Sequence, residues 1–220
     1  SKMRKIKSIL FIGMIAMLCF LRFNKINWGL PYAFHPDERN MANAVMSLQW
    51  QDGLNPHFFA YGQLPLYLAY FLLKVVKLAG GSVIAGISFL EATLALRLIS
   101  AVASILTVLV ALKIINQLTS LKINELGQDR ISILGCMLFI FSPVLIQLAH
   151  FGTTEALLLF FYTLLIWLSL KKLHKKFNGK EYLLLAATIV GLAAATKVSS
   201  LIFSLLPITV IIWEELEKPE

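Results

Sequence analysis

The sequence has little charge, few cysteines and no metal-binding motif. Only 15% of its residues are charged, whereas 58% are hydrophobic, which is more apolar than a typical soluble domain. The two cysteines, Cys19 and Cys136, lie inside apolar runs, where they act as small hydrophobic residues. The pattern therefore excludes a disulfide framework, and no CxxC or HExxH spacing indicates a metal centre.

Basic residues outnumber acidic ones, which leaves a net charge of +8. They are scattered between apolar runs, and no basic stretch laced with aromatic residues offers a groove for a nucleic-acid strand. We therefore expect no nucleic-acid partner. In a membrane protein, such an excess usually belongs to loops on the cytoplasmic side.

Long apolar runs predict an all-α integral membrane protein. No internal repeat or low-complexity linker divides the chain, so we expect one membrane domain over residues 1–220. Several runs fall short of the roughly 20 residues that a hydrocarbon core requires, and snorkelling lysines can extend them. The six predicted transmembrane helices lie at about 6–22, 93–115, 131–149, 155–170, 182–196 and 198–213.

The apolar segment at about 64–80 is ambiguous, because lysines interrupt it after roughly ten residues, a length more typical of interfacial helices. If this segment does not span, the basic loops around 113–130 and 171–180 share the cytoplasm with the basic N-terminus. Since positive charge concentrates in the cytoplasm, we predict a juxtamembrane helix within a long outer loop, 23–92. The predicted location is the plasma membrane, with a cytoplasmic N-terminus.

This topology gathers polar residues on the outer face. The outer loop carries "HPDE" at 35–38, and the turns at 149–155 and 195–200 lie on the same side. Because ionisable groups at membrane depth are costly and tend to mark sites, we expect the outer face to carry the active site.

Asp37 and Glu38 follow Pro36, which predicts a helix start with both acids in the first turn. The helix dipole favours negative charge there, so the simplest interpretation is support of the helix end. A cap does not need two adjacent carboxylates, however, since they repel each other. A carboxylate partly shielded by the bilayer can act as a general base near neutral pH. We predict catalytic roles for Asp37 and Glu38.

Glu155, Lys197 and Arg97 should share that face. Glu155 opens the fourth span, where it could simply support a helix start together with a Thr153 or Thr154 cap. Lys197 and Arg97 could be snorkelling residues. Two outer cations oppose the positive-inside trend, so we predict that both bind an anion such as phosphate, and that Glu155 is a further catalytic candidate.

The remaining polar residues of the outer face are predicted to contact substrate: His35, Arg39, Tyr61 and His150. With nearby carboxylates, His35, His57 and His150 could also ligate a divalent metal, although their spacing matches no metal motif. No cofactor is assigned, and a divalent metal stays open.

Five motifs carry a resemblance to a known family: "HPDE", "YGQLPLYL", "ALRLISAVASILTVLVAL", "HFGTTEALLLFFYTLLIWLSLKK" and "GLAAATKVSSLIF". Their succession resembles the N-terminal half of the GT-C glycosyltransferases, over about Leu10 to Leu206. The nearest kin are bacterial relatives of the protein O-mannosyltransferases and aminoarabinose transferases. "HPDE" in a first outer loop is fairly specific, whereas the other motifs are loose.

The resemblance implies a polytopic enzyme that takes a sugar from a polyprenyl-phosphate donor. It implies Asp37 as catalytic base, Glu155 as a second acid and Lys197 as a donor-phosphate ligand. Many relatives carry Lys-Pro-Pro-Leu where this chain has Gln63–Leu66, so that lysine contact is missing. Relatives are also considerably longer, and we therefore expect a fragment or an unusually small member.

We favour an inverting glycosyltransferase that acts on a hydroxyl of a lipid, glycan or protein, among membrane lipids. Half of a transporter or channel is the first alternative, but it should carry charges near the midplane of its spans. Here the span interiors are nearly free of charge. A non-catalytic, lipid-binding membrane scaffold is the second alternative, and only turnover separates it from the enzyme.

Overall fold

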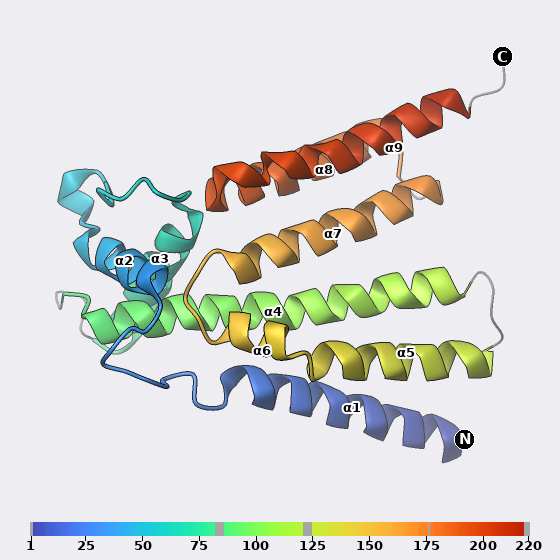
Figure 1. Ribbon diagram of the computed structural model, residues 1–220, viewed down its shortest axis with the longest axis horizontal. Helices are drawn as coiled ribbons and strands as arrows, with labels where there is room; N and C mark the ends of the chain where they lie inside the picture. The colour runs from blue at the N-terminus through green and yellow to red at the C-terminus, as the bar shows by residue number, and fades with distance from the viewer. Residues whose placement is uncertain (1, 82–85, 121–124, 176, 218–220) are drawn as a thin grey trace.

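The computed structural model describes residues 2–81, 86–120, 125–175 and 177–217. Within these ranges the chain is helical and forms no strand, which confirms the predicted all-α membrane fold (Figure 1). The elements are α1 (Lys2–Phe23), α2 (Pro36–Ser47), η1 (Trp50–Asp52), α3 (Leu64–Ala79), α4 (Phe89–Thr119), α5 (Glu125–Ile140), α6 (Pro143–Ala149), α7 (Glu155–Leu173), α8 (Gly179–Thr196), η2 (Val198–Ser204) and α9 (Leu205–Leu216).

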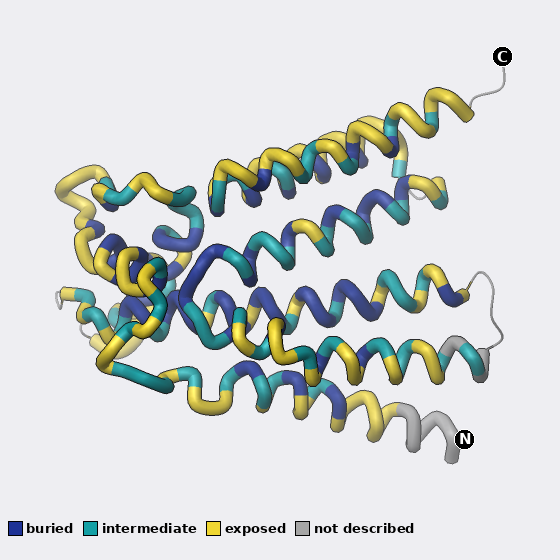
Figure 2. Tube along the Cα trace, viewed as in Figure 1, coloured by how far each residue is buried: buried dark blue, intermediate teal, exposed yellow. Residues whose placement is uncertain are grey.

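Helix α4 is the centre of the bundle. Its 31 residues span about 46 Å at 1.5 Å per residue, which exceeds a hydrocarbon core of about 30 Å. It packs against α7, α5 and α1, and also against α2 and α3. Figure 2 shows α4 as one of the most deeply buried helices, while α9 and α1 keep long exposed faces. The predicted span 93–115 is therefore extended at both ends.

The span predicted at 131–149 is not one straight helix. It consists of α5 and α6, which are bent by 51° at their junction. Pro143 begins α6, and a proline cannot supply the N–H that a continuous helix needs. The Ser142 side chain instead accepts a hydrogen bond from the Leu145 N–H (3.5 Å), so the helix restarts there.

The predicted helix 198–213 is also divided. Lys197 adopts an extended backbone (φ −160°, ψ 122°) after α8, and the chain then forms the 3-10 helix η2 before α9 begins. Seven residues are long for a 3-10 helix, a form that often marks a functional hinge. Lys197 therefore lies at a break in the backbone, between α8 and η2.

In the part of the chain that the structure describes, four helical stretches are long and apolar enough to cross a membrane: Phe89–Thr119, Glu155–Leu173, Gly179–Thr196 and Val198–Leu216. The bent pair of α5 and α6 passes the same test when it is taken together, and Ser8–Phe23 of α1 is a shorter apolar helix. The total of six spans therefore stays a prediction.

The three predicted outer regions meet at one end of the bundle. Figure 1 shows α2 and α3 beside the starts of α4 and α7 and the end of α1, with the junction of α8 and η2 at the same end. The ends of α4 and α7 lie at the opposite end, together with the starts of α1, α5 and α8. Helix α3 matches the helix predicted at 64–80 and lies outside the candidate spans.

Candidate functional site

The first turn of α2 separates the two adjacent acids. His35 is the N-cap with an extended backbone (φ −98°, ψ 123°), and its Nδ1 accepts a hydrogen bond from the Asp37 N–H (3.2 Å). Pro36 begins the helix, as predicted. Because consecutive helical residues diverge by about 100°, Asp37 stays partly exposed whereas Glu38 is fully buried.

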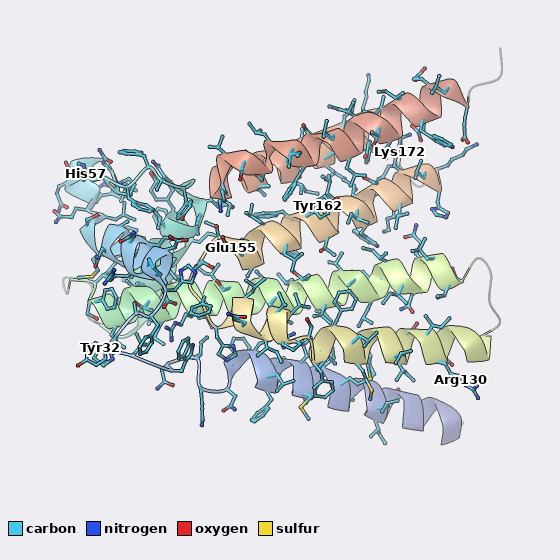
Figure 3. The ribbon with its side chains drawn as sticks, in the orientation of Figure 1. Tyr32, His57, Arg130, Glu155, Tyr162 and Lys172 are labelled. Carbon is cyan, nitrogen blue, oxygen red and sulfur yellow. The ribbon has the colours of Figure 1, made fainter. Side chains whose placement is uncertain are left out.

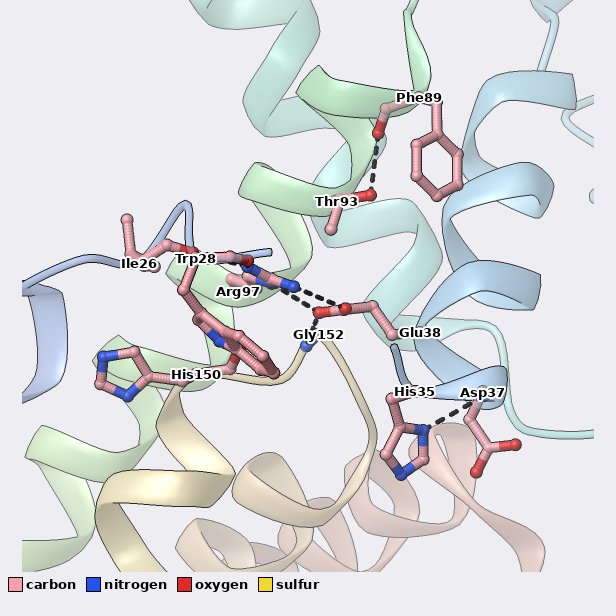
Figure 4. A network of polar contacts seen from close by, with 10 residues as sticks. All are labelled: Ile26, Trp28, His35, Asp37, Glu38, Phe89, Thr93, Arg97, His150 and Gly152. Carbon is pink, nitrogen blue, oxygen red and sulfur yellow. Dashed lines mark hydrogen bonds and ion pairs between the residues drawn. The ribbon is translucent and has the colours of Figure 1, made fainter. Parts of the chain in front are cut away.

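Glu38 forms a two-point ion pair with Arg97 (Figure 4). The guanidinium Nε donates to Oε1 at 2.7 Å and Nη2 donates to Oε2 at 2.8 Å. Both side chains have 0% exposure. Paired guanidinium–carboxylate hydrogen bonds of this kind are among the strongest in proteins.

Arg97 uses its remaining donors on the segment that follows α1. Its Nη1 donates to the carbonyl oxygens of Ile26 (2.9 Å) and Trp28 (2.7 Å). The guanidinium also lies 5.3 Å from the centroid of the Trp28 ring, a cation–π distance. Arg97 thus holds the outer loop against α4.

Gly152 connects the ion pair to the turn that precedes α7. Its N–H donates to Glu38 Oε1 at 2.7 Å. A Cβ at this position would lie 2.6 Å from Leu96 Cβ, so the close approach requires glycine. Glu38 therefore joins α2, α4 and this turn.

Two of the predicted roles do not fit this geometry. Arg97 was expected to bind donor phosphate and Glu38 to act in catalysis, but neither side chain has an exposed surface for a ligand. The physical reason is that Arg97 lies on the buried face of α4, where an unpaired charge would be costly. A carboxylate with matched geometry compensates that charge.

Asp37, Tyr61, Lys197 and Glu155 form a separate, accessible cluster. The Tyr61 hydroxyl faces the Asp37 carboxylate, which makes the hydroxyl harder to deprotonate. Lys197 Nζ lies 5.1 Å from the Tyr61 ring centroid and 3.5 Å from Glu155 Oε1. The structure thus brings together four predicted site residues from segments that are far apart in the sequence.

Tyr61 lies in an electronegative environment. The hydrogen bond to Asp37 raises the pKa of the Tyr61 hydroxyl above 10.0, and burial and the charges of Asp37 and Glu155 act in the same direction. All of these effects disfavour the phenolate. Tyr61 is therefore a hydrogen-bond donor throughout the physiological range.

Glu155 is held by the two threonines that precede it. Thr154 Oγ1 donates to Glu155 Oε1 at 3.1 Å, and Thr153 also makes a hydrogen bond to the carboxylate. The predicted helix cap is wrong in detail, because the Thr154 side chain caps no backbone N–H. Figure 3 shows Glu155 at the start of α7, facing α2 and α3.

The two ion pairs of this region differ in how far their side chains are exposed to solvent. The Lys197 and Glu155 side chains are 35% and 39% exposed, whereas Glu38 and Arg97 are closed to solvent. A loosely held, exposed pair contributes little to stability. The Lys197 ammonium is therefore open to solvent, unlike the Arg97 guanidinium.

His150 has a different environment from the one predicted. Its Nε2 lies 2.9 Å from the Asn24 carbonyl oxygen and its Nδ1 lies 2.7 Å from that of Ile146. Trp28 Nε1 donates to the His150 carbonyl oxygen at 3.2 Å. His150 joins α6 to the end of α1, and both ring nitrogens face protein carbonyls instead of a substrate.

The other predicted contacts differ in availability. The His35 ring lies 5.1 Å from the Phe151 ring, next to the cluster. Arg39 is exposed and makes no ion pair or hydrogen bond through its side chain within the described ranges. His35 and Arg39 thus remain candidates for contact with substrate.

The three histidines do not converge on a metal site. His57 pairs with Asp52 (3.1 Å) on the exposed loop and lies at the far edge of the outer end (Figure 3). Among the residues that the structure describes, no group of three or more His, Cys, Asp or Glu could hold a metal ion.

Two glycines contribute to the site and were missed from the sequence. Gly152 donates to Glu38 (2.7 Å), and the Gly62 N–H donates to the Thr196 carbonyl oxygen (3.0 Å). Each stands beside polar residues in a short motif, "FGTT" and "YGQ". A glycine in such a place commonly indicates close backbone approach, and this is the signal that could have found them.

Comparison with known families decides the class. A family model described as dolichyl-phosphate-mannose-protein mannosyltransferase matches residues 65–219, more than half of the chain. The chain belongs to this family. Searches of curated proteins and of solved structures returned no match.

Membership confirms the resemblance to the GT-C glycosyltransferases. A member of this mannosyltransferase family is an integral membrane glycosyltransferase that uses a polyprenyl-phosphate sugar donor. Arg97, Glu155 and Lys197 lie inside the matched range, whereas Asp37 and Tyr61 precede it.

Proposed function

We propose that this mannosyltransferase-family protein transfers a sugar from a polyprenyl-phosphate donor to a hydroxyl acceptor, with inversion, at the outer face of the plasma membrane. The observation that carries the proposal is the accessible cluster of Asp37, Tyr61, Lys197 and Glu155 at the end of the apolar helices. The N-terminus is then cytoplasmic, and residues 1–220 act as a single membrane domain.

Asp37 is the proposed base. Its carboxylate takes the proton of the acceptor hydroxyl while the acceptor oxygen forms a bond to the anomeric carbon. The bond from that carbon to the phosphate oxygen breaks, and the polyprenyl phosphate leaves with the electron pair. A single displacement of this kind inverts the anomeric centre. Partial exposure of Asp37 supports the role, because a base must reach its proton directly or through one water.

Lys197 is the proposed ligand of the donor phosphate. A cation placed where negative charge develops on the leaving group stabilises the transition state. The 3.5 Å pair with Glu155 holds the ammonium in the site before the donor binds. Glu155 in turn is held by Thr154, and we propose that its exposed carboxylate also helps to position the acceptor.

An apolar cavity on the same elements suits a prenyl chain. Its volume is about 390 Å³, and its lining begins five residues beyond Lys197 on η2 and seven residues beyond Glu155 on α7. Both paths correspond to about 10 Å at the rise of a 3-10 or an α-helix. The lining residues are Tyr162, Ile202, Phe203, Leu205, Leu206 and Thr209. A lipid whose phosphate contacts Lys197 can therefore place its chain between α7 and α9.

Glu38 and Arg97 are proposed to position the cluster instead of contacting substrate. Glu38 follows Asp37 on α2, and Gly152 lies three residues before Glu155. Because Glu38 accepts hydrogen bonds from both Arg97 and Gly152, the buried pair fixes the base relative to α7. Geometry of this kind matters, since small misplacements slow oriented reactions strongly.

Asp37→Asn in the membrane-embedded enzyme tests the proposal. We expect transfer from a labelled polyprenyl-phosphate sugar to fall by about 10²–10⁴-fold, the usual contribution of a general base. Asp52→Asn is the matched control, because Asp52 is an exposed acid of the same loop that pairs with His57. Full activity of Asp37→Asn, with an unchanged unfolding transition, would refute the assignment.

A further inference from the structure

Gly62 attaches the loop before α3 to the end of α8. Its N–H donates to the Thr196 carbonyl oxygen at 3.0 Å, one residue before Lys197. Carbonyls at a helix C-terminus lack partners within the helix, so the loop satisfies one of them. The loop thereby contacts α8 at the residue that precedes the proposed phosphate ligand.

This contact admits only glycine at position 62. A Cβ on Gly62 would lie 2.1 Å from the Ala195 carbonyl oxygen and 2.8 Å from the Thr196 carbonyl carbon. Both are backbone atoms that a rotamer change cannot move. Any larger residue must therefore push the loop away from α8.

The attached loop places Tyr61 between the base and the cation. The Tyr61 hydroxyl faces the Asp37 carboxylate, close enough to interact with it, and the centroid of its ring lies 5.1 Å from Lys197 Nζ. Phe58 supports the ring from the side, with centroids 5.9 Å apart. The hydroxyl and the ring of Tyr61 thus each face a charged group of the protein.

We propose that Tyr61, held by Gly62, is a positioning residue that sets the separation between Asp37 and Lys197. This inference rests on the proposed function. In an in-line displacement, the base that deprotonates the acceptor and the cation that binds the leaving phosphate lie on opposite sides of the anomeric carbon. The distance between these two groups must therefore be fixed. One rigid side chain that bonds to the first and packs under the second supplies that separation. Tyr61 itself contacts neither sugar nor phosphate.

Two substitutions of Tyr61 separate its two contacts. Tyr61→Phe keeps the ring under Lys197 but loses the hydrogen bond to Asp37. We expect kcat to fall about 10- to 100-fold, in line with the loss of one hydrogen bond to a charged group, while the KM for the donor stays unchanged. Tyr61→Leu also removes the ring, so we expect the donor KM to rise as well.

The split between kcat and the donor KM is the readout that a merely structural role would not produce. A general loss of the loop's structure should change both constants, whereas loss of the contact with Asp37 alone should lower kcat and leave the donor KM unchanged.

Gly62→Ala tests the attachment of the loop without altering any functional side chain. We expect kcat to fall at least tenfold, because Tyr61 moves away from both partners. Gly86→Ala is the matched control, since Gly86 precedes α4 and a Cβ there meets nothing within 4 Å. That control should retain kcat within about twofold, in keeping with the small effect of ordinary surface substitutions.

The outcomes distinguish the two proposals. If Asp37→Asn is inactive while Tyr61→Phe and Gly62→Ala keep full kcat, the positioning role is wrong and the proposed base stands. If Tyr61→Phe raises only the donor KM, Tyr61 is a substrate ligand and the positioning role is again wrong. If Asp37→Asn is active, the proposed function itself falls.

Discussion

Glu38 and Arg97 lie 59 positions apart in the sequence, yet two hydrogen bonds of 2.7 and 2.8 Å join their fully buried side chains. Because Asp37 precedes Glu38 on the same helix turn, the pair also determines where the adjacent carboxylate can point. The two acids of "HPDE" thus divide their tasks, one inside the protein and the other at the accessible cluster.

The buried pair should contribute strongly to stability. Arg97→Met leaves the Glu38 carboxylate buried without its partner, which typically costs about 3–5 kcal/mol. We expect a loss of this size in the free energy of unfolding, measured by titration with a denaturing detergent in mixed micelles. Arg39→Met should change that free energy by less than about 0.5 kcal/mol, because Arg39 is exposed.

A double substitution shows whether the two side chains act as one unit. Glu38→Leu combined with Arg97→Met removes both charges, so its cost should be smaller than the sum of the single costs. Strict additivity would mean that the pair does not couple, and equal stability of Arg97→Met and Arg39→Met would remove its structural role.

Much of the end of the bundle that carries the cluster could be predicted from the sequence. Pro36 indicated the start of α2, and its restriction on His35 indicated the extended residue before it. The distribution of lysines predicted that the helix at 64–80 does not cross with the others. This assignment brought Asp37, Glu155 and Lys197 to one end. Figure 1 shows the starts of α2 and α7 and the end of α8 there, and Lys197 contacts Glu155 and Tyr61.

Other features depended on packing that the sequence does not reveal. Helix α4 is apolar nearly all round, so no periodicity indicated that Arg97 points inward. Because nothing marked Arg97 as buried, nothing indicated that Glu38 is its bidentate partner. The break at Pro143 was visible in principle, but the length of the apolar run at 131–149 outweighed it.

Lys197 should act through its charge. Lys197→Met removes the cation that faces Glu155 and the Tyr61 ring, and we expect the donor KM to rise and kcat to fall, each by at least tenfold. Lys197→Arg should restore part of the affinity, because guanidinium groups also bind phosphate. Donor titrations of the three proteins give both constants.

Lys25→Met is the matched control for that experiment. Lys25 is an exposed lysine that follows the end of α1, and it lies outside the cluster. If Lys25→Met weakens donor use as much as Lys197→Met does, the effect reflects general surface charge and Lys197 loses its specific role.

The Tyr61 hydroxyl should lose its proton at a higher pH than the hydroxyl of an ordinary tyrosine. The interaction with Asp37 raises the pKa of the Tyr61 hydroxyl above its ordinary value, so phenolate absorbance from this residue should appear at a higher pH than that of an ordinary tyrosine. The stabilising hydrogen bond is fully present below the unfolded-state pKa and is lost as the pH rises through the higher folded-state pKa. The measurement is the difference in ultraviolet titration between the wild type and Tyr61→Phe.

Asp37→Asn should shift this Tyr61 titration back toward its ordinary range, since the substitution removes the negative charge that opposes the phenolate. Asp52→Asn should leave it in place. A Tyr61 transition that is unaffected by Asp37→Asn would show that the hydroxyl does not bond to Asp37.

The orientation of the bundle can be tested by labelling its two ends. With Cys19 and Cys136 first replaced by alanine, Phe59→Cys introduces a thiol at an exposed position of the outer loop, and Lys175→Cys introduces one at the end of α7. A membrane-impermeant maleimide added to intact cells should label the first protein directly. It should label the second only after permeabilisation, because basic loops stay in the cytoplasm.

The reverse pattern would place Asp37 and Lys197 in the cytoplasm and reject the outer-face assignment. The contacts within the cluster would be untouched, since they do not depend on which side of the membrane they face.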